Sequence, residues 1–321
     1  MHICNCLLFK NIKLNLLVNM NKIKIFFRRV TPKIIWNFFI IIKRIFSINR
    51  SIPLSFLKFG KQKNKIIALG NGPSLSSDME AILSKVTTNE FDVVCVNNFA
   101  CSEYFVMLKP SKYVLIDEYY FSPNAHVSWK EQRTTTFKHI NEFTTWDMTI
   151  FVPAVADLDA IKSIIKNPLV KIIKLRVAGI DLGANAFNKL VYNTGFFGPY
   201  QVNVLIYAIY ISIWAKYSEI EIYGADMSFH KNVDVDQSSN ELIIKFTHFN
   251  DQSHIEKFNK NPEKIEPFTM VEFLELTYKT FRAHEILESY SISKKCKIKN
   301  MSNYSLIDSY SRPGLNNDKR K

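Results

Sequence analysis

The stretch that most constrains the fold is residues 65–75, with the sequence Lys-Ile-Ile-Ala-Leu-Gly-Asn-Gly-Pro-Ser-Leu. A mostly apolar, β-type run leads directly into Gly70 and Gly72, and a helical pattern follows from about Ser77. A buried strand that turns through glycines into a helix leaves backbone N–H groups pointing at one spot in front of the helix dipole. The segment therefore predicts a phosphate- or nucleotide-binding turn, with a tight turn that binds no ligand as the alternative.

The two glycines have an expected role in that turn. Gly70 and Gly72 permit positive φ and a close approach of ligand atoms to the backbone. Pro73 suits the first turn of a helix, where no N–H is needed. We expect Gly70, Asn71, Gly72 and Ser74 to contact the ligand.

Strand and helix patterns alternate along the rest of the chain. Strands are predicted at residues 65–69, 91–96, 112–116, 148–152, 170–175, 219–223 and 295–299. Helices are predicted at residues 78–86, 157–166, 199–217 and 269–290, the first with Ser76 or Ser77 as its cap. This alternation predicts an α/β fold with a doubly wound, mostly parallel, Rossmann-like sheet in one domain over residues 61–310.

Residues 227–267 differ from the rest of this domain. They are polar, contain His230, His248 and His254, and show no sustained period. A long stretch without a pattern inside a compact chain is usually a lid or a small subdomain over a site. We therefore expect a lid here, and a disordered tail over residues 311–321.

The positive charge is concentrated near the N-terminus. The net charge is +13, but residues 1–77 hold 14 of the 42 Lys and Arg residues and no Asp or Glu, which leaves 28 basic against 29 acidic residues in the remainder. An enzyme that acts on nucleic acid should have a basic surface around its site, and this domain is near neutral. We therefore expect no nucleic-acid partner.

The N-terminal arm, residues 1–60, is predicted to associate with a membrane. Its apolar run at residues 34–42 is flanked by basic residues and is too short to cross a bilayer, which takes about 20 apolar residues. Such a segment suits the interface of an anionic leaflet, with binding that weakens as salt rises; a helix packed on the domain is the alternative. The five cysteines show no C-x-x-C spacing, which fits a reducing cytosol. We expect a cytoplasmic protein, peripheral on the inner face of the membrane.

Ligands in open α/β sheets bind beyond the carboxyl ends of the strands. Besides the glycine turn, the polar residues expected at those ends are Asn97, Asn98, Asp117, Asn193, Thr194, Gly195 and Asp226. A side-chain amide carries donors and an acceptor, so that Asn97 or Asn98 is suited to a base edge such as that of cytosine. Capping of a turn explains both asparagines equally well.

Several nucleotide and metal motifs are missing. A dinucleotide fingerprint needs a third glycine where Leu75 stands and an acid where Asn97 stands, and no G-x-x-x-x-G-K-[ST] sequence is present. The histidines of residues 227–267, together with Asp251, lack the spacing of a metal site. We therefore expect no obligatory metal and no cofactor.

Four blocks of the sequence follow the order seen in bacterial sialyltransferases of glycosyltransferase family 42. They are Gly70-Asn71-Gly72-Pro73-Ser74-Leu75, Phe91-Asp92-Val93 leading to Asn97-Asn98-Phe99, Asn193-Thr194-Gly195 before a long helix, and residues 220–226. The chain also resembles the broader group of nonulosonate-transfer and motility-accessory proteins that share the Gly-x-Gly-Pro-Ser turn. Where the family has tyrosines after its Gly-x-Asp turn, this chain has Ser228, Phe229 and His230.

The resemblance implies a modified Rossmann-type, GT-A-like transferase with a lid, which takes CMP-sialic acid or a related CMP-activated keto-sugar without an obligatory metal. The acceptor would be a hydroxyl of a surface glycan, such as lipooligosaccharide or capsule, and a homo-oligomer is compatible with it. Asn71 would contact the phosphate or sugar, Asn97 the nucleotide, and Thr194 and Gly195 the donor. A lid histidine would act as the general base.

Transfer of the sugar requires that the acceptor hydroxyl lose a proton, which suits a histidine with a pKa near neutrality. We favour His248, between Thr247 and Phe249, over His254 as this base, with His230 among the donors to the leaving phosphate. One rival is a diphosphokinase like the archaeal hydroxymethylpterin enzymes, which needs Mg²⁺ and clustered carboxylates. The other is a non-catalytic scaffold that keeps the nucleotide fold.

Overall fold

The structure is a computed structural model that describes residues 63–175, 177–246, 254–261 and 266–313, with the isolated residues 35, 38, 39, 41, 42, 54, 57, 60 and 263. The chain forms two compact units, Met1–Ser51 with Leu182–Ala184 and Ile52–Asp181 with Asn185–Lys321. The second unit contains the fold described below. Most of the N-terminal arm lies outside the described residues, so its membrane association stays a prediction. No helix among the described residues has the length and apolar character that a bilayer-spanning helix needs.

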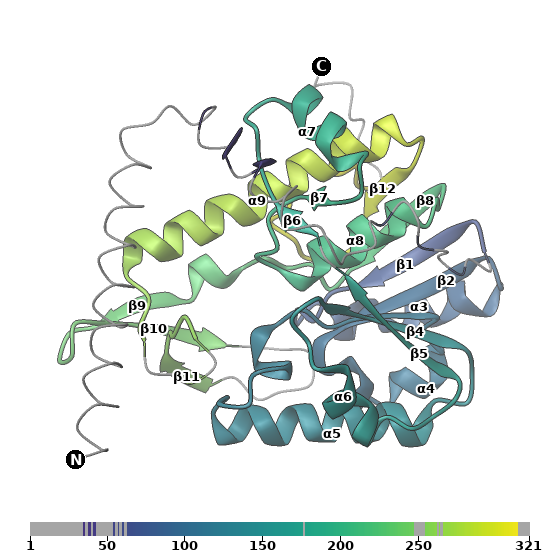
Figure 1. The fold of residues 1–321 in the computed structure, drawn as a ribbon, viewed down its shortest axis with the longest axis horizontal. Coiled ribbons are helices and arrows are strands. Elements are labelled where there is room, and N and C mark those ends of the chain that lie inside the picture. Colours follow the sequence, from purple (N-terminus) through teal and green to yellow (C-terminus); the bar gives the residue numbers. More distant parts are fainter. Residues whose placement is uncertain are drawn as a thin grey trace, which may run out of the picture. The chain divides into compact units, whose positions relative to one another are not determined.

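A seven-stranded sheet forms the centre of the second unit, and every pairing in it is parallel (Figure 1). In spatial order the strands are β12 (Lys297–Asn300), β8 (Glu219–Tyr223), β1 (Lys65–Leu69), β2 (Phe91–Val96), β3 (Lys112–Val114), β4 (Met148–Pro153) and β5 (Val170–Leu175). The chain runs from β1 to β5 toward one edge and then returns to place β8 on the other side of β1. The winding therefore reverses between β1 and β8, and the predicted doubly wound, parallel α/β fold is confirmed.

Helices cover both faces of this sheet (Figure 1). One group comprises α3 (Leu75–Thr87), α4 (Tyr104–Leu108), α5 (Val127–Phe143) and α6 (Leu158–Ile164), and the other α7 (Asn185–Tyr192), α8 (Val204–Trp214) and α9 (Met270–Ser293). Ile67 and Leu69 of β1 belong to the core under the first group, while Ile66 and Ala68 lie on the opposite face of the strand. All four side chains are fully buried, as expected for a parallel strand that is covered on both faces.

The region 227–267 contains a second, antiparallel sheet that was not predicted from the sequence. Its order is β11 (His254–Lys257), β10 (Glu241–Phe246) and β9 (Val233–Asp236). The Val-Asp-Val-Asp sequence of β9 has the period of two that a strand requires. Asn240, with a φ of 54°, lies in the turn that connects β9 to β10. Two short strands, β6 (Ala178–Gly179) and β7 (Phe197–Gly198), form a further parallel pair.

Helix α5 was also missed, because its apolar pattern is weak. Only Thr136, Phe137 and Ile140 of its 17 residues are buried. It also contains a run of three β-branched threonines, which have a low helix propensity. Each threonine hydroxyl donates a hydrogen bond to the carbonyl four residues earlier, so these side chains are accommodated inside the helix.

Hydrogen bonds explain two of the differences between the predicted boundaries and the structure. The helix predicted over residues 199–217 begins only at Val204, because the Asn203 Oδ1 accepts a hydrogen bond of 2.8 Å from the Leu205 N–H and caps it. At the C-terminus, Ser311 accepts a hydrogen bond of 2.8 Å from the Asn300 N–H at the end of β12. Residues 314–321 of the predicted disordered tail lie outside the described residues.

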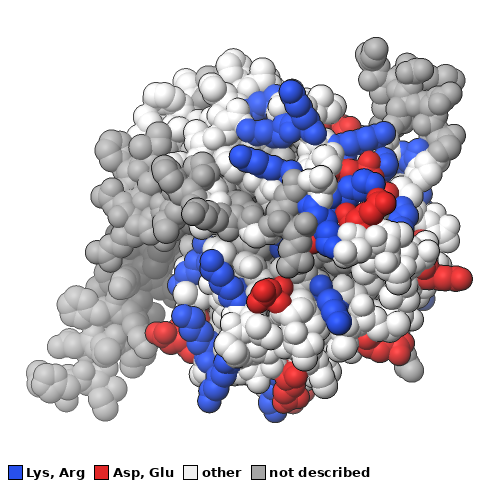
Figure 2. All heavy atoms as spheres, turned by 90° about the vertical axis from the view of Figure 1, so that its right-hand side faces the viewer, with Lys and Arg blue, Asp and Glu red and all other residues white. Residues whose placement is uncertain are grey.

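The surface of the fold carries both signs of charge. Lys and Arg side chains lie among Asp and Glu on the face seen in Figure 2. Described ion pairs include Lys65–Glu90 at 2.8 Å and Lys299–Glu219 at 2.7 Å. This mixture agrees with the near-neutral composition of the residues that follow the arm.

Gly70 and Gly72 are required by packing between two turns. Neither adopts the positive φ expected from the sequence. The Gly70 N–H donates to the Tyr223 carbonyl at 2.8 Å, and the Gly72 N–H donates to the Gly224 carbonyl at 2.9 Å. A Cβ atom on Gly70 would overlap the Gly224 carbonyl, and one on Gly72 would overlap the Asp226 carboxylate. The glycines therefore let the turn after β1 lie directly against the turn after β8.

We expect the substitution Gly70→Ala to lower the free energy of unfolding by about 1–3 kcal/mol, the usual effect of overpacking against a rigid neighbour. Denaturant unfolding followed by circular dichroism measures the change. The control is Gly60→Ala, since a Cβ atom at Gly60 would meet no atom within 4 Å. Equal stabilities of the two variants would contradict this explanation of Gly70.

Candidate functional site

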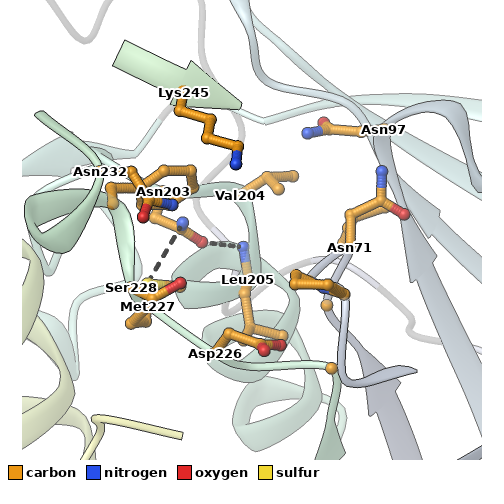
Figure 3. A pocket seen from close by; sticks show the side chains of 16 residues that line it. Asn71, Asn97, Asn203, Val204, Leu205, Asp226, Met227, Ser228, Asn232 and Lys245 are labelled. Atoms are coloured by element: carbon orange, nitrogen blue, oxygen red, sulfur yellow. Dashed lines mark hydrogen bonds between the residues drawn. The ribbon is translucent and has the colours of Figure 1, made fainter. Parts of the chain in front are cut away.

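Two adjoining cavities lie at the carboxyl ends of the central strands, where the winding of the sheet reverses. The first has a volume of about 220 Å³ and is lined by Gly70, Asn71, Gly72, Pro73, Val96, Asn97, Asn203, Val204, Leu205, Gly224, Asp226, Met227, Ser228, Phe229, Asn232 and Lys245 (Figure 3). The second has a volume of about 260 Å³ and is lined by Asn97, Asp117, Val202, Asn203, Val204, Met227, Phe229, His230, Phe258, Phe273, Leu276, Thr277, Thr280 and Phe281. We call them the amide cavity and the phenylalanine cavity. Such a switch point is the usual ligand site of an open α/β sheet.

The N-terminus of α3 is occupied by a carboxylate of the chain itself. The Ser74 hydroxyl donates a hydrogen bond of 2.7 Å to the Asp226 Oδ2, and the Ser74 N–H lies 3.2 Å from the Asp226 Oδ1. Ser74, and not Ser76 or Ser77, is the residue at the N-cap. Burial raises the pKa of Asp226, while the hydrogen bonds from Ser74 oppose that shift.

The position of this carboxylate argues against phosphate binding at the turn, which the sequence predicted. The N–H groups of Gly70 and Gly72 bond to the turn after β8, and that of Ser74 bonds to Asp226. A phosphate placed here would have to displace these partners and would be repelled by the carboxylate when it is ionised. Asn71 and both glycines line the amide cavity. The N–H groups of Gly70, Gly72 and Ser74, however, are already bonded within the protein and are not free to bind an anion.

Three asparagines follow β1 and β2, and of these Asn71 and Asn97 line the amide cavity, whereas Asn98 lines neither cavity. The Asn71 Nδ2 donates a hydrogen bond to the Asn98 Oδ1, which fixes both side chains. The Oδ1 atoms of Asn71 and Asn97 are buried and have no hydrogen-bond partner among the described residues. Buried polar atoms are normally paired, so a ligand that donates hydrogen bonds would satisfy both oxygens.

Asn97 is held in an uncommon backbone conformation. Its φ of 49° lies in the left-handed region, which asparagine tolerates better than most residues. The Tyr113 hydroxyl donates a hydrogen bond of 2.6 Å to the Asn97 carbonyl and accepts one of 2.8 Å from the Ala100 N–H. This buried tyrosine on β3 thereby fixes the turn that aims Asn97 at both cavities.

Asp117, which follows β3, lines the phenylalanine cavity. Burial raises the pKa of its carboxyl group from 3.8 to about 6, and a hydrogen bond with the Asn97 side chain partly opposes that shift. A carboxyl group with a pKa near the working pH is suited to proton transfer. Asn97 therefore connects the acid of one cavity to the amides of the other.

Four polar residues of the amide cavity, Asn203, Ser228, Asn232 and Lys245, were not predicted as site residues. Asn203 directly precedes a long apolar run, and an asparagine in that place is the usual sign of a helix N-cap. Asn203 could therefore have been predicted from the sequence. Asn232 and Lys245 come from the region 227–267, where no strand pattern was recognised. Lys245 is the only cationic side chain among the described residues that line this cavity, and Figure 3 shows it pointing into the cavity.

The remaining predicted residues are dispersed. Asn193, Thr194 and Gly195 form the turn between α7 and β7 and line neither cavity; the Thr194 hydroxyl donates to the Val191 carbonyl at 2.7 Å. Their assignment to the donor therefore has no support from the cavity geometry. His230 lines the phenylalanine cavity, with its ring 6.0 Å from that of Phe281.

Only one of the two histidines favoured as general base lies among the described residues. His248 lies outside the described residues. His254 is the first residue of β11 and is paired in register with Phe246 of β10.

Asp117 and Asp226 line different cavities, and the described residues hold no group of three or more His, Cys, Asp or Glu that could bind a metal ion.

The raised pKa of Asp117 predicts how one substitution depends on pH. An acid with a raised pKa in the folded state contributes stability that is fully present below its unfolded pKa, near 4, and lost as the pH rises through about 6. Asp117→Asn should therefore raise the Tm relative to the parent chain at pH 8 but not at pH 4, as measured by differential scanning calorimetry. The control Glu118→Gln removes a neighbouring exposed carboxylate and measures the effect of losing a surface charge. A Tm difference for Asp117→Asn that is the same at both pH values would contradict the assignment.

The chain was compared with protein families, curated proteins and solved structures. No protein-family description matches the sequence, and no curated protein matches it. Among solved structures, the MAf glycosyltransferase from Magnetospirillum magneticum AMB-1 is similar, with a TM-score of 0.44 and 10% identity. The similarity covers 81% of this chain and 37% of that one, so the chain spans well under half of that protein. The α/β assignment itself rests on the seven parallel strands.

Proposed function

We propose that this chain is a glycosyltransferase that moves sialic acid or a related keto-sugar from a CMP donor to an acceptor hydroxyl. The observation that carries the proposal is the amide cavity at the switch point of the sheet, with its two unpaired oxygens on Asn71 and Asn97. Hydroxyl and amino groups of a nucleoside or a sugar are the donors that such oxygens need. The sequence blocks that resemble glycosyltransferase family 42 imply the same reaction class.

We propose that the donor phosphate binds between Lys245 and the N-terminus of α8, and not at α3. Asn203, Val204 and Leu205, which begin α8, line the amide cavity together with Lys245. A helix N-terminus and an ammonium group attract an anion together, whereas Asp226 disfavours one at the start of α3. Neither cavity alone reaches the roughly 300 Å³ of a typical small-molecule site, so a whole CMP-sugar would also extend toward the neighbouring cavity.

The reaction proposed here needs three events. The acceptor hydroxyl loses its proton to a general base as it attacks the anomeric carbon. The bond from that carbon to the phosphate oxygen breaks, and CMP leaves with the electron pair. Lys245 would stabilise the charge on the leaving phosphate, and a surface glycan is the acceptor that the sequence resemblance implies.

Calorimetric titration with CMP, cytidine, UDP, ATP and NAD, without metal and with Mg²⁺, tests the donor assignment. CMP should bind best and without metal. The substitution Lys245→Ala should weaken the binding of CMP about 10-fold or more, because a hydrogen bond to a charged group contributes about 1.5–3 kcal/mol to the binding free energy. Cytidine, which has no phosphate, should be unaffected.

The matched control for this titration is Lys257→Ala on β11. Lys257 belongs to the same small sheet, pairs with Glu241 and lines neither cavity. Equal CMP affinities for the Lys245 and Lys257 variants would contradict the phosphate position. Binding of ATP that depends on Mg²⁺, with no binding of CMP, would favour the diphosphokinase instead.

A further prediction concerns the general base. His248→Ala should lower the transfer rate by about 10²–10⁴, the usual contribution of a positioned base, and leave the affinity for CMP unchanged. His254→Ala, assayed beside it with the same donor, should retain its rate. The opposite result would exchange the two roles. Wild-type rates for both variants would remove the histidine mechanism.

A further inference from the structure

The phenylalanine cavity differs in chemistry from the amide cavity beside it. Four phenylalanines line it, together with Val202 and Leu276. Phe273, Leu276 and Phe281 come from one face of α9, and the ring of Phe258 packs against that of Phe273 at 5.6 Å. This wall has little capacity for hydrogen bonds and favours an apolar ligand.

The threonines of this wall offer no hydrogen-bond donor to a ligand. The Thr277 hydroxyl donates to the Phe273 carbonyl at 3.0 Å, and the Thr280 hydroxyl donates to the Leu276 carbonyl at 2.9 Å. Both hydroxyl hydrogens are therefore used inside α9, and neither is available as a donor to a ligand. Asn203 is likewise engaged, since its Oδ1 accepts from Leu205 and its Nδ2 lies 3.7 Å from the Met227 sulfur.

The polar capacity of the cavity is concentrated in a few groups. Asp117 and Asn97 follow neighbouring strands of the main sheet, and His230 comes from the short helix η4 (Phe229–Lys231). Asn97 also lines the amide cavity, where the donor is proposed to bind. A hydroxyl group that meets Asp117 would therefore lie next to the junction of the two cavities.

We infer that the phenylalanine cavity binds the acceptor, and that the acceptor carries an apolar, ring-sized group beside the hydroxyl that meets Asp117. The acceptor role rests on the proposed glycosyl transfer. Such an acceptor departs from the surface glycan that the sequence resemblance implies. A bare glycan fits this cavity poorly, because its hydroxyls would face phenylalanine rings and lose their hydrogen bonds to water. An aromatic or branched aliphatic alcohol places its apolar part against α9 and its single hydroxyl against the carboxylate.

Ligand-observed NMR titration tests this inference with three probes, benzyl alcohol, toluene and methyl β-galactoside. Benzyl alcohol should bind at least 5-fold more tightly than methyl β-galactoside, and its affinity should not change when CMP is present. It should also bind more tightly than toluene, which has the ring but not the hydroxyl. Equal or tighter binding of the galactoside would overturn the inference.

The matched variants are Leu276→Trp and Leu274→Trp. Leu276 lines the cavity, whereas Leu274, two residues earlier on α9, is 54% exposed. The larger side chain at position 276 should fill the cavity and weaken the binding of benzyl alcohol at least 10-fold. The change at position 274 should leave that affinity unchanged. If Leu276→Trp does not fold, as judged by its Tm, the smaller substitution Thr280→Leu replaces it. Retained binding in the folded filling variant would overturn the inference.

The titration with CMP separates this inference from the proposed function. Competition between CMP and benzyl alcohol would assign the cavity to the nucleobase and overturn the acceptor role. A second outcome is that CMP fails to bind while benzyl alcohol binds to the parent chain and not to Leu276→Trp. That result would contradict the CMP donor, and the assignment of an apolar ligand to the phenylalanine cavity would stand. Glycosyl transfer to benzyl alcohol in the presence of the CMP-sugar, absent in Leu276→Trp, would support both.

Discussion

The contact between Ser74 and Asp226 is the interaction on which the candidate site depends. It joins the turn after β1 to the turn after β8, two segments separated by 152 residues in the sequence. Gly70 and Gly72 let these turns approach so closely that their N–H groups bond across the gap. The same contact neutralises the start of α3 with a carboxylate of the chain. At the switch point of the sheet, the N-terminus of α3 is thus occupied by Asp226, while the start of α8 lines the amide cavity.

This arrangement changes the chemistry expected of a glycine-rich turn. Such turns are usually anion sites, but here the turn serves packing and delivers Asn71 to the cavity wall. The polar groups that line the amide cavity are mainly amide side chains, which carry both donors and acceptors. Lys245 alone supplies a positive charge among the described residues of the amide cavity.

The sequence was sufficient to predict the main sheet, since strands such as residues 91–96 are apolar runs bounded by turns and are found as expected. Asn71, Asn97, Asp117 and Asp226 were also predicted to follow strands of that sheet, and they line the cavities, while their contacts with a ligand stay a prediction. Lys245 and Asn232 escaped because the small antiparallel sheet has short strands with weak patterns. The turn at residues 193–195 was misplaced because a sequence does not reveal which loop faces the carboxyl edge. Nor does it show that Asp226 already occupies the N-terminus of α3.

The order of the strands has a consequence for how this domain is assembled. Strands β1 to β5 pair with their successive neighbours in the chain, whereas β8 pairs with β1 only after the intervening residues 70–218 have been placed. Contacts of such long sequence separation form late, because closing the loop costs entropy before any pairing is gained. During synthesis from the N-terminus, the half-sheet is available for folding well before β8 leaves the ribosome. The candidate site is therefore incomplete in the growing chain until β8 and the segments that follow it have been synthesised.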